Sequence, residues 1–417
     1  MPAANTLGEL LATLFDKRPF GRKVEDSRPL PELCSALLAE KTEVSGHQIA
    51  TAVLNRYKQV DDEGKAAFFN FLNEKLDLDA KAISDLARSY SDDPSAQNFK
   101  ALSKASEPGR QELFRRLNQA PGATAELVRM RVDLLALLQT APELARTDHD
   151  FVHLLRSWFN RGFLVLRQIT WDSPASVLEK IIAYEAVHEI RTWDDLRRRL
   201  HPTDRRCFAF FHPAMPDEPL IFVEVALTTG VPGSIQNVLS DNREVIGEND
   251  VDTAVFYSIS NCQEGLAGIS FGNSLIKQVA RDLAHELPSV KTFVTLSPIP
   301  GLVRWLEKVG LADAVHDQDM LKKLAARYLL EAKTPDGKPL DPVARFHLGN
   351  GALVHAVHPG ADLSENGLAQ SGGAMVNYLY DLSRISQNLL LFANNKEIAA
   401  APAVKTLARQ AAKNIEA

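Results

Sequence analysis

Apolar residues recur every three or four positions through the first third of the chain, and this spacing predicts amphipathic helices. The repeat is clearest in residues 7–14, 33–38, 66–76 and 125–138, with proline or polar breaks between these segments. No fixed repeat period of the kind that builds a solenoid occurs. We therefore expect an all-α helical domain, a bundle or array, over residues 1–150.

The pattern changes after Thr147, where short apolar runs of strand length begin to alternate with amphipathic helices. FLVLR at 163–167 predicts a strand, and Ser173 followed by Pro174 predicts the N-cap and first turn of a helix. Thr192 is placed to cap a second short helix, TWDDLRRRL. This alternation predicts a sheet covered by helices.

The central part of that sheet is indicated by three longer apolar runs. CFAFF at 207–211 and LIFVEVAL at 220–227 are joined by turn formers and predict an antiparallel hairpin. TAVFYSIS at 253–260 is apolar on both faces, as expected of a covered central strand, and an amphipathic helix over 272–287 follows. Further expected elements are a strand at 290–296, a helix near 302–306, an insertion at 311–345, strands at 352–357 and 375–380, and terminal helices.

These elements predict the α+β class, with an all-α domain followed by a mixed-sheet α/β domain over 151–417. The length of 417 residues suits two or three domains. With 47 Lys plus Arg against 53 Asp plus Glu, the formal net charge is −6. A mildly acidic chain is a poor general binder of nucleic acid, because that affinity needs a strongly basic face. An anionic small ligand would need only a local basic pocket.

The cysteines and the chain ends contain no sign of export or membrane insertion. Cys34, Cys207 and Cys262 are far apart and odd in number, so neither a disulfide framework nor a structural zinc site is expected. No other strong metal motif occurs. No apolar run approaches the ~18 residues of a membrane span, and the first residues lack a cleavable signal pattern. We expect a cytoplasmic protein without membrane contact.

The turn GLAGISFGN joins the predicted strand at 253–260 to the helix at 272–287. Gly265, Gly268 and Gly272 would let backbone N–H groups and a helix N-terminus approach a phosphate. Their spacing is GxxGxxxG, whereas a dinucleotide fingerprint needs GxGxxG. The turn is therefore either a phosphate cradle or a tight connection.

Two polar residues near predicted strands are candidates for chemistry. Ser297 follows a buried strand and precedes a proline, which suits either an exposed hydroxyl at a strand end or an ordinary N-cap. His347 precedes the tight turn Gly349–Gly351 and is either functional or a structural histidine. Tyr378 and Tyr380 are expected in core packing, although a hydroxyl there can orient a ligand, and we take Tyr380 as a substrate-binding candidate.

The arginines around residue 200 form the strongest local concentration of positive charge. They are either phosphate ligands or a solvated helix face balanced by Asp194, Asp195 and Asp204. The members of this run are Arg197, Arg198, Arg199, Arg205 and Arg206.

From residue 160 onward the order of elements resembles the GNAT-type acyltransferase fold, in which the turn after the fourth strand holds the pyrophosphate of coenzyme A. Several segments are more similar still to the malonyl-CoA decarboxylase family. These are SPASVLEKIIAYEAVH, CFAFFHPAMPDEPLIFVEVAL, AVFYSISNCQEGLAGISFGNSLIK, TLSPIPG, DPVARFHLGNGA and MVNYLY, together spanning about 155 to 380.

This resemblance implies specific site residues. Ser297 of TLSPIPG and His347 of DPVARFHLGNGA take the catalytic Ser and His positions of the family. The CoA-binding turn would comprise Ala267, Gly268, Ile269, Ser270, Phe271, Gly272 and Asn273. Animal members carry Gln and Glu where this chain has Ala267 and Ser270, so here backbone groups rather than those side chains would contact phosphate.

The implied activity is decarboxylation of malonyl-CoA to acetyl-CoA and CO₂ through an enolate. His347 would donate the proton, and Ser297 would bind the malonyl carboxylate or relay a proton. Since the thioester is itself the electron sink, no cofactor is expected beyond the CoA of the substrate. The family forms oligomers, so a homo-oligomer, dimer or tetramer, assembled through the helical domain is expected. An acyl-CoA-dependent N-acyltransferase and a non-catalytic acyl-CoA sensor remain alternatives.

Overall fold

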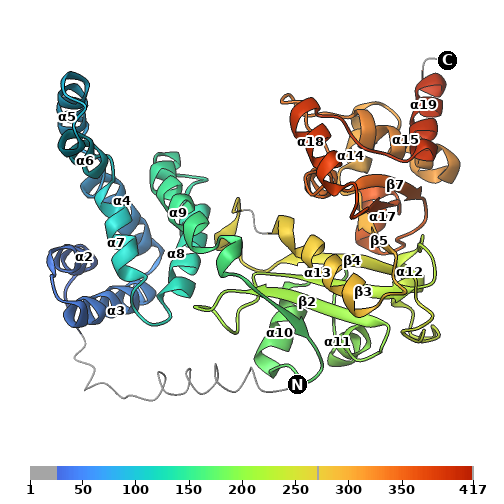
Figure 1. Ribbon diagram of the computed structural model, residues 1–417, viewed down its shortest axis with the longest axis horizontal. Helices are drawn as coiled ribbons and strands as arrows, with labels where there is room; N and C mark the ends of the chain where they lie inside the picture. The colour runs from blue at the N-terminus through green and yellow to red at the C-terminus, as the bar shows by residue number, and fades with distance from the viewer. Residues whose placement is uncertain (1–25, 270–271, 416–417) are drawn as a thin grey trace. The chain divides into compact units, whose positions relative to one another are not determined.

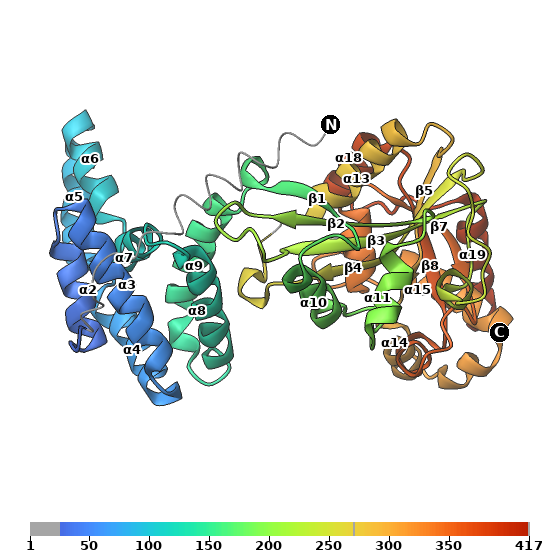
Figure 2. The ribbon, with the colours of Figure 1, turned by 90° about the horizontal axis from the view of Figure 1, so that it is seen from below.

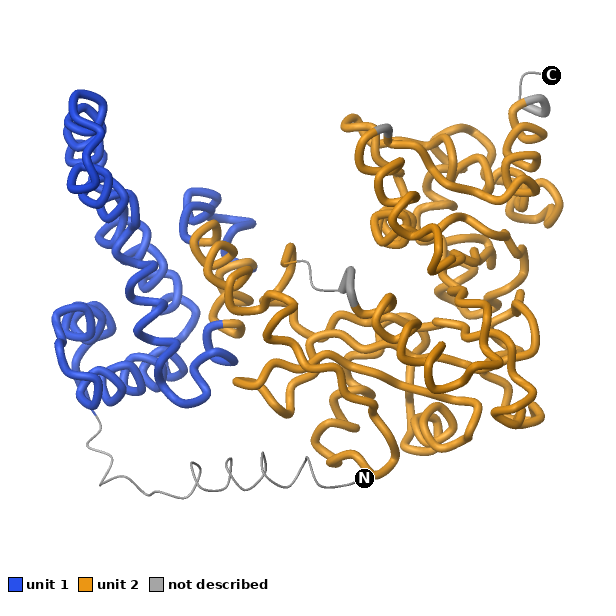
Figure 3. The backbone as a smooth tube through the Cα atoms, in the orientation of Figure 1, with its two compact units in different colours: residues 1–127, 136–147 blue, residues 128–135, 148–417 orange. Residues whose placement is uncertain are grey.

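The computed structural model describes residues 26–269 and 272–415 (Figure 1). The described chain divides into two compact units (Figure 3). The first takes the described residues up to Leu127 together with 136–147, and the second takes Val128–Leu135 and everything from Asp148 onward. The helix predicted at 7–14 lies outside the described residues. The functional roles predicted for the domains 1–150 and 151–417 stay predictions.

The first unit is helical, as its sequence pattern predicts. Side-chain caps begin several of its helices: Asp61, Asp79 and Ser95 each accept a backbone N–H of the turn that follows. Its helices are α2 (Leu30–Ala39), α3 (Glu43–Gln59), α4 (Asp62–Lys75), α5 (Ala80–Asp92), α6 (Ala96–Ala105), α7 (Gly109–Leu117) and the short η1 (Pro142–Leu144). Both α8 (Ala123–Leu137) and α9 (Ala145–Trp158) contribute residues to each unit.

The second unit is built on one mixed sheet. Its strands are β1 (Val165–Ile169), β2 (Arg205–Phe211), β3 (Ile221–Thr228), β4 (Thr253–Asn261), β5 (Thr292–Thr295), β6 (Ser297–Pro298), β7 (Leu353–His358) and β8 (Met375–Leu379). The order is β1-β2-β3-β4-β5-β8-β6, with β7 on β8. Only β4 and β5 pair in parallel among these strands. The α+β class is confirmed.

Helices cover both faces of the first four strands. Along β2 the small residues Cys207 and Ala209 face α10 (Ala175–Tyr184) and α11 (Trp193–Leu200). The opposite face packs against α13 (Gly272–Glu286), as Figures 1 and 2 both show. Thr192 caps α11 as predicted, and the Asp195 side chain completes a capping box by accepting the backbone N–H of Thr192.

The remaining helices connect the strands or follow the last of them. These helices are η2 (Arg161–Phe163), α12 (Ile235–Leu239), η3 (Glu264–Leu266), α14 (Leu302–Lys308), η4 (Ala312–His316), α15 (Gln318–Glu331), α16 (Pro342–Leu348), α17 (Glu365–Ser371), α18 (Ile385–Asn395) and α19 (Pro402–Ile415). Of these, α19 packs on β7 and on α15. Among the described residues, no helix is both long and apolar enough to cross a membrane.

The sheet opens where β4 and β5 separate. Their parallel register runs only from Thr253 opposite Thr292 to Phe256 opposite Thr295. Strand β4 then continues to Asn261, whereas the chain after β5 enters β6 and pairs with β8 instead. The opening therefore has the start of β6 on one side and the second half of β4, which leads into the glycine turn, on the other.

One local prediction is confirmed and another is wrong. The tight turn predicted after His347 is present, and His347 itself lies in α16, which Asp341 caps and whose first turn contains Pro342. The turn follows it, and Gly351 there adopts φ +87°. Ser173 does not cap α10: Pro174 is the N-cap residue, and the Ser173 hydroxyl accepts the N–H of Thr170 instead.

Candidate active site

Ser297 begins β6 at the opening of the sheet and is 5% exposed. Its hydroxyl donates to Thr295 Oγ1 at 2.8 Å. The same Oγ lies 3.2 Å from Nε2 of His347, which comes from a helix 50 residues further along the chain. The two residues that the family resemblance pairs as catalytic are therefore in direct contact.

His347 is enclosed by aromatic rings and by uncharged hydrogen-bond partners. Its Nδ1 lies 2.8 Å from the Tyr380 hydroxyl, and Tyr378 stacks on its ring with centroids 4.5 Å apart. Burial lowers the pKa of His347 to about 3, because the charged imidazolium would lose its hydration. The imidazole is therefore neutral at physiological pH.

The donors and acceptors around His347 can be assigned from the hydrogen bonds that Thr295 accepts. Thr295 Oγ1 accepts both the Ser297 hydroxyl and the backbone N–H of Tyr378 at 3.1 Å. Since the Ser297 proton points to Thr295, Ser297 Oγ accepts from His347 Nε2–H. A neutral imidazole carries one proton, so Nδ1 must accept from Tyr380. Burial also raises the pKa of Tyr380 well above its usual value, so its phenol keeps the proton.

The result is a neutral hydrogen-bond chain that runs Tyr380 to His347 to Ser297 to Thr295. Sequence reasoning identified the first three of these residues but missed Thr295. The available signal was its position two residues before Ser297, since alternate residues of an extended segment share a side. Asn377 was missed as well: its Nδ2 donates to the Thr295 carbonyl at 2.8 Å and supports the chain from β8.

The glycine turn follows the neighbouring strand, β4. Ala267, Gly268 and Ile269 form a turn after η3, in which Ile269 N–H donates to Leu266 O at 3.0 Å. Gly268 adopts φ +77°, which a residue with a side chain rarely does. Gly272 and Asn273 begin α13, whereas Ser270 and Phe271 lie outside the described residues.

The arginine run is mostly part of the folded core. Arg197 and Arg198 are exposed, in line with a solvated helix face. The other three arginines are buried, which neither alternative anticipated. Arg199 pairs with Glu224 at 2.9 Å, Arg205 with Asp204 at 3.3 Å and Arg206 with Glu248 at 2.6 Å. Their charges are thus already balanced by carboxylates.

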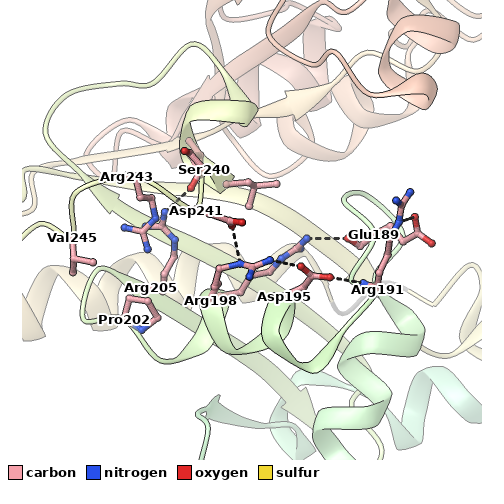
Figure 4. A pocket seen from close by; sticks show the side chains of 13 residues that line it. Glu189, Arg191, Asp195, Arg198, Pro202, Arg205, Ser240, Asp241, Arg243 and Val245 are labelled. Carbon is pink, nitrogen blue, oxygen red and sulfur yellow. Dashed lines mark hydrogen bonds and ion pairs between the residues drawn. The ribbon is translucent and has the colours of Figure 1, made fainter.

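Arginines 198, 199 and 205 also line a pocket of about 400 Å³ (Figure 4). Arg191 and Arg243 complete its basic lining, and each of the five has an acidic partner. None of the lining residues belongs to the Tyr380–Ser297 chain or to the glycine turn. The guanidinium groups of this pocket are therefore already paired with carboxylates, and Arg205 and Arg243 share that of Asp204.

No metal cluster is found in residues 26–269 and 272–415: no three His, Cys, Asp or Glu side chains gather there as one would require. Cys34, Cys207 and Cys262 are free and buried, and burial raises the pKa of the Cys34 thiol to about 12. That thiol is therefore protonated and unreactive. The groups with suitable geometry for chemistry are those of the Tyr380–Ser297 chain.

A mixed sheet with a neutral serine–histidine–tyrosine chain at its opening, and a glycine turn after the neighbouring strand, has the layout of an enzyme domain. The family models match accordingly: "Malonyl-CoA decarboxylase C-terminal domain" over residues 162–317 and 310–417, and "Malonyl-CoA decarboxylase N-terminal domain" over 76–159. The chain belongs to the malonyl-CoA decarboxylase family.

Individual relatives agree with this assignment. The chain is 35% identical over 357 residues to the mitochondrial malonyl-CoA decarboxylase of Anser anser anser, with 74% of this chain and 71% of that protein covered. Crystal structures of malonyl-CoA decarboxylases are similar too. That from Rhodopseudomonas palustris has a TM-score of 0.85 at 48% identity, covering 90% of this chain and 98% of the other. That from Agrobacterium vitis has 0.87 at 47%, covering 91% and 99%.

Proposed function

We propose that this chain decarboxylates malonyl-CoA to acetyl-CoA and CO₂, with Ser297, His347 and Tyr380 as its proton-handling residues. The observation that carries the proposal is the buried neutral chain linking these three side chains at the sheet opening. Membership of the family supplies the reaction, and the geometry of the chain supplies the roles.

The reaction breaks the bond between the malonyl carboxylate and the methylene carbon. The electron pair of that bond moves into the thioester as an enolate, CO₂ leaves, and the carbon then takes one proton. A donor placed at the developing thioester oxyanion is worth about 3 kcal/mol. The segment of β4 beyond Phe256, where the ladder with β5 ends, is the proposed source of such backbone N–H donors.

The arrangement supports Ser297 as a proton relay. The hydroxyl of Ser297 turns from Thr295 toward the enolate carbon, gives its proton to that carbon and takes the Nε2 proton of His347. In the same step Nδ1 takes the phenolic proton of Tyr380, and Tyr380 takes a replacement proton from water. Each side chain gives one proton and receives one, so no imidazolium forms in a site where burial disfavours it. Rotation of the two hydroxyls and exchange of the imidazole proton with water then restore the starting tautomer before the next turnover. A hydrogen bond from Ser297 to the malonyl carboxylate is the second role that its position permits.

Phosphate recognition is assigned to the turn at 267–273. Backbone N–H groups and the start of α13 offer partial positive charge there. Arg156 of α9 adds a full charge: its Nη2 lies 3.4 Å from Gly268 O, and no acidic side chain among the described residues pairs with it. Such local charge suits a highly anionic ligand of a chain whose net charge is −6.

The N-acyltransferase alternative needs a base to deprotonate an amine. His347 is poorly suited, because its Nε2 is the protonated nitrogen and its pKa is lowered to about 3. A non-catalytic sensor would require no proton transfer and therefore does not account for the Ser297–His347–Tyr380 chain. Decarboxylation uses all three side chains in the protonation states that their contacts impose.

The decisive experiment is incubation of the purified protein with malonyl-CoA alone in heavy water. We expect acetyl-CoA and CO₂ to form without an acyl acceptor, with one deuterium in the methyl group by mass spectrometry. Acetyl-CoA incubated in parallel is the control for exchange after the reaction. Malonyl-CoA that stays intact, or is consumed only after an amine is added, would contradict the proposal.

Three further properties belong to the same proposal. The enzyme works without a cofactor beyond the CoA of its substrate, since the thioester accepts the electrons. It forms a homodimer or homotetramer through the helical region and acts in the cytoplasm, in fatty acid metabolism. Three free, buried cysteines are in keeping with a reducing compartment.

A further inference from the structure

One buried arginine holds the turn that we propose for CoA. Arg131 of α8 is 2% exposed, and its Nη1 donates to Gly265 O at 2.8 Å and to Ala267 O at 2.9 Å. Its Nε and Nη2 donate to the carboxylate of Asp148 at 2.7 Å and 3.4 Å. Each guanidinium nitrogen therefore has a partner, and all the residues involved belong to the second compact unit.

The contact with Ala267 sets the direction of the next backbone donor. Ala267 C=O and Gly268 N–H belong to one peptide unit, and in a trans peptide these two groups point in opposite directions. With the carbonyl on Arg131, the N–H of Gly268 points away from the guanidinium. Gly268 also has φ +77°. The N–H groups on either side of it are used inside the turn, since Ala267 N–H donates to Glu264 O at 2.9 Å and Ile269 N–H to Leu266 O at 3.0 Å. The N–H of Gly268 is therefore the donor of this described turn that is left to face a ligand.

The backbone of α8 also fits closely against the turn. A Cβ added at Gly265 would lie 2.0 Å from the carbonyl oxygen of Val128, far inside a normal contact. Glycine at 265 therefore allows α8 to approach near enough for Arg131 to reach both carbonyls. The turn is fixed by an ion-paired side chain together with a backbone contact from the same helix.

We propose that Arg131 is a positioning residue for the substrate. It orients the backbone N–H of Gly268 toward the pyrophosphate of CoA and does not touch the substrate itself. Its charge is neutralised by Asp148, so it acts through the two carbonyls and not as a phosphate ligand. This inference rests on the proposed binding of CoA by the turn that contains Gly268.

The test is Arg131→Lys, assayed with two substrates. Lysine keeps the charge beside Asp148 but lacks the planar fork that reaches two carbonyls at once. The substrates are malonyl-CoA and malonyl-N-acetylcysteamine, a thioester without the pyrophosphate and nucleotide. We expect KM for malonyl-CoA to rise about 10-fold while kcat stays within about 2-fold. This combination is the result of losing an interaction that stabilises the bound substrate and the transition state equally. The kcat/KM for malonyl-N-acetylcysteamine should match that of the unmodified enzyme.

Matched variants make the outcome unambiguous. Arg129→Lys alters an exposed arginine of the same helix and should leave both substrates unaffected. Asp148→Asn weakens the hold on Arg131 without removing it and should give the same split between substrates, to a smaller extent. Equal losses with both substrates would reveal a merely structural role and overturn the inference, as would no loss with either.

The proposed function has a separate readout in this experiment. If the unmodified enzyme uses both thioesters with equal kcat/KM, the turn does not recognise phosphate, and its assignment falls together with the role of Arg131. If the unmodified enzyme prefers malonyl-CoA but Arg131→Lys retains the whole preference, only the role of Arg131 is wrong.

Discussion

The second unit contains two buried polar clusters of opposite electrical character. The chain from Tyr380 through His347 and Ser297 to Thr295 contains no charge at neutral pH. The ion cluster, which we define as Arg199, Glu224, Glu185 and Ser258, is built around one arginine and two carboxylates, of which that of Glu185 is half-buried. Arg199 binds Glu224 at 2.9 Å and the carbonyl of His188 at 2.8 Å, while Glu185 accepts the Ser258 hydroxyl at 2.7 Å.

The difference shows what each arrangement is suited to do. The ion cluster ties α11 and the segment after α10 to β3 and β4, because each charge has a fixed partner on another element. Burying these charges removes them from water. At Glu224 burial raises the pKa to about 7, although Arg199 acts in the opposite direction. The neutral chain can move protons between its members without creating an unpaired buried charge. One cluster fixes the fold, and the other can react.

The largest loss of turnover is expected when either side chain of the Ser297–His347 contact is replaced. Ser297→Ala and His347→Gln should each lower kcat by roughly 100- to 10,000-fold, the usual contribution of a positioned proton donor. The affinity for CoA, measured by calorimetry, should stay within about 2-fold, because neither side chain belongs to the turn. A variant with near-normal turnover would remove that residue from the mechanism.

The next largest effect is expected on the free energy of unfolding, when the ion cluster is altered, and not on turnover. Arg199→Met leaves Glu224 buried without its partner and should lower the free energy of unfolding by about 3–5 kcal/mol, measured by denaturant titration. The double variant Arg199→Met with Glu224→Leu should recover most of that loss, since it removes both charges.

Arg198→Met is the matched control, because Arg198 is an exposed neighbour on the same helix and its surface ion pairs contribute less than about 1 kcal/mol. If Arg199→Met unfolded at the same denaturant concentration as the unmodified protein, the ion cluster would have no structural role. If it remained folded but lost kcat, the division between the two clusters would be wrong.

The smallest expected effect on kcat is the difference between replacing the two tyrosines beside His347. Tyr380→Phe removes the donor to Nδ1 and should lower kcat about 5- to 30-fold, in keeping with about 1–2 kcal/mol for one hydrogen bond. Tyr378→Phe keeps the stacked ring, and the hydroxyl it removes has no hydrogen-bond partner among the described residues, so kcat should stay within about 2-fold. Equal effects of the two changes would show that Tyr380 acts by packing alone.

The fold was predictable where the determining interactions are local. Apolar spacing predicts α13 and the hairpin of β2 and β3, and Thr192 as an N-cap residue predicts the start of α11. The burial of Arg199 could not be predicted in this way, because its partner Glu224 lies 25 residues away on β3. A charged run looks the same in a sequence whether its partners are water or carboxylates on another strand.

The candidate site was predictable only in part. Ser297 and His347 are 50 residues apart, so no periodicity connects them, and the family resemblance alone suggested the pair that the structure brings together. Which tyrosine of NYLY reaches Nδ1 depends on where α16 packs. Thr295 could have been suspected from its position two residues before Ser297, but its hydrogen bond to Ser297 depends on the fold. The catalytic roles themselves stay predictions until the variants are measured.

The contact between Arg131 and the turn has a consequence for dividing this protein into pieces. The C-terminal family match begins at residue 162, and a fragment cut there would contain Gly265 and Ala267 but neither Arg131 nor Asp148. Both carbonyls would then lose their donor. A boundary drawn between family segments is therefore not a boundary of the physical unit, and any piece of this chain that keeps the contact of Arg131 with the turn has to begin no later than Val128.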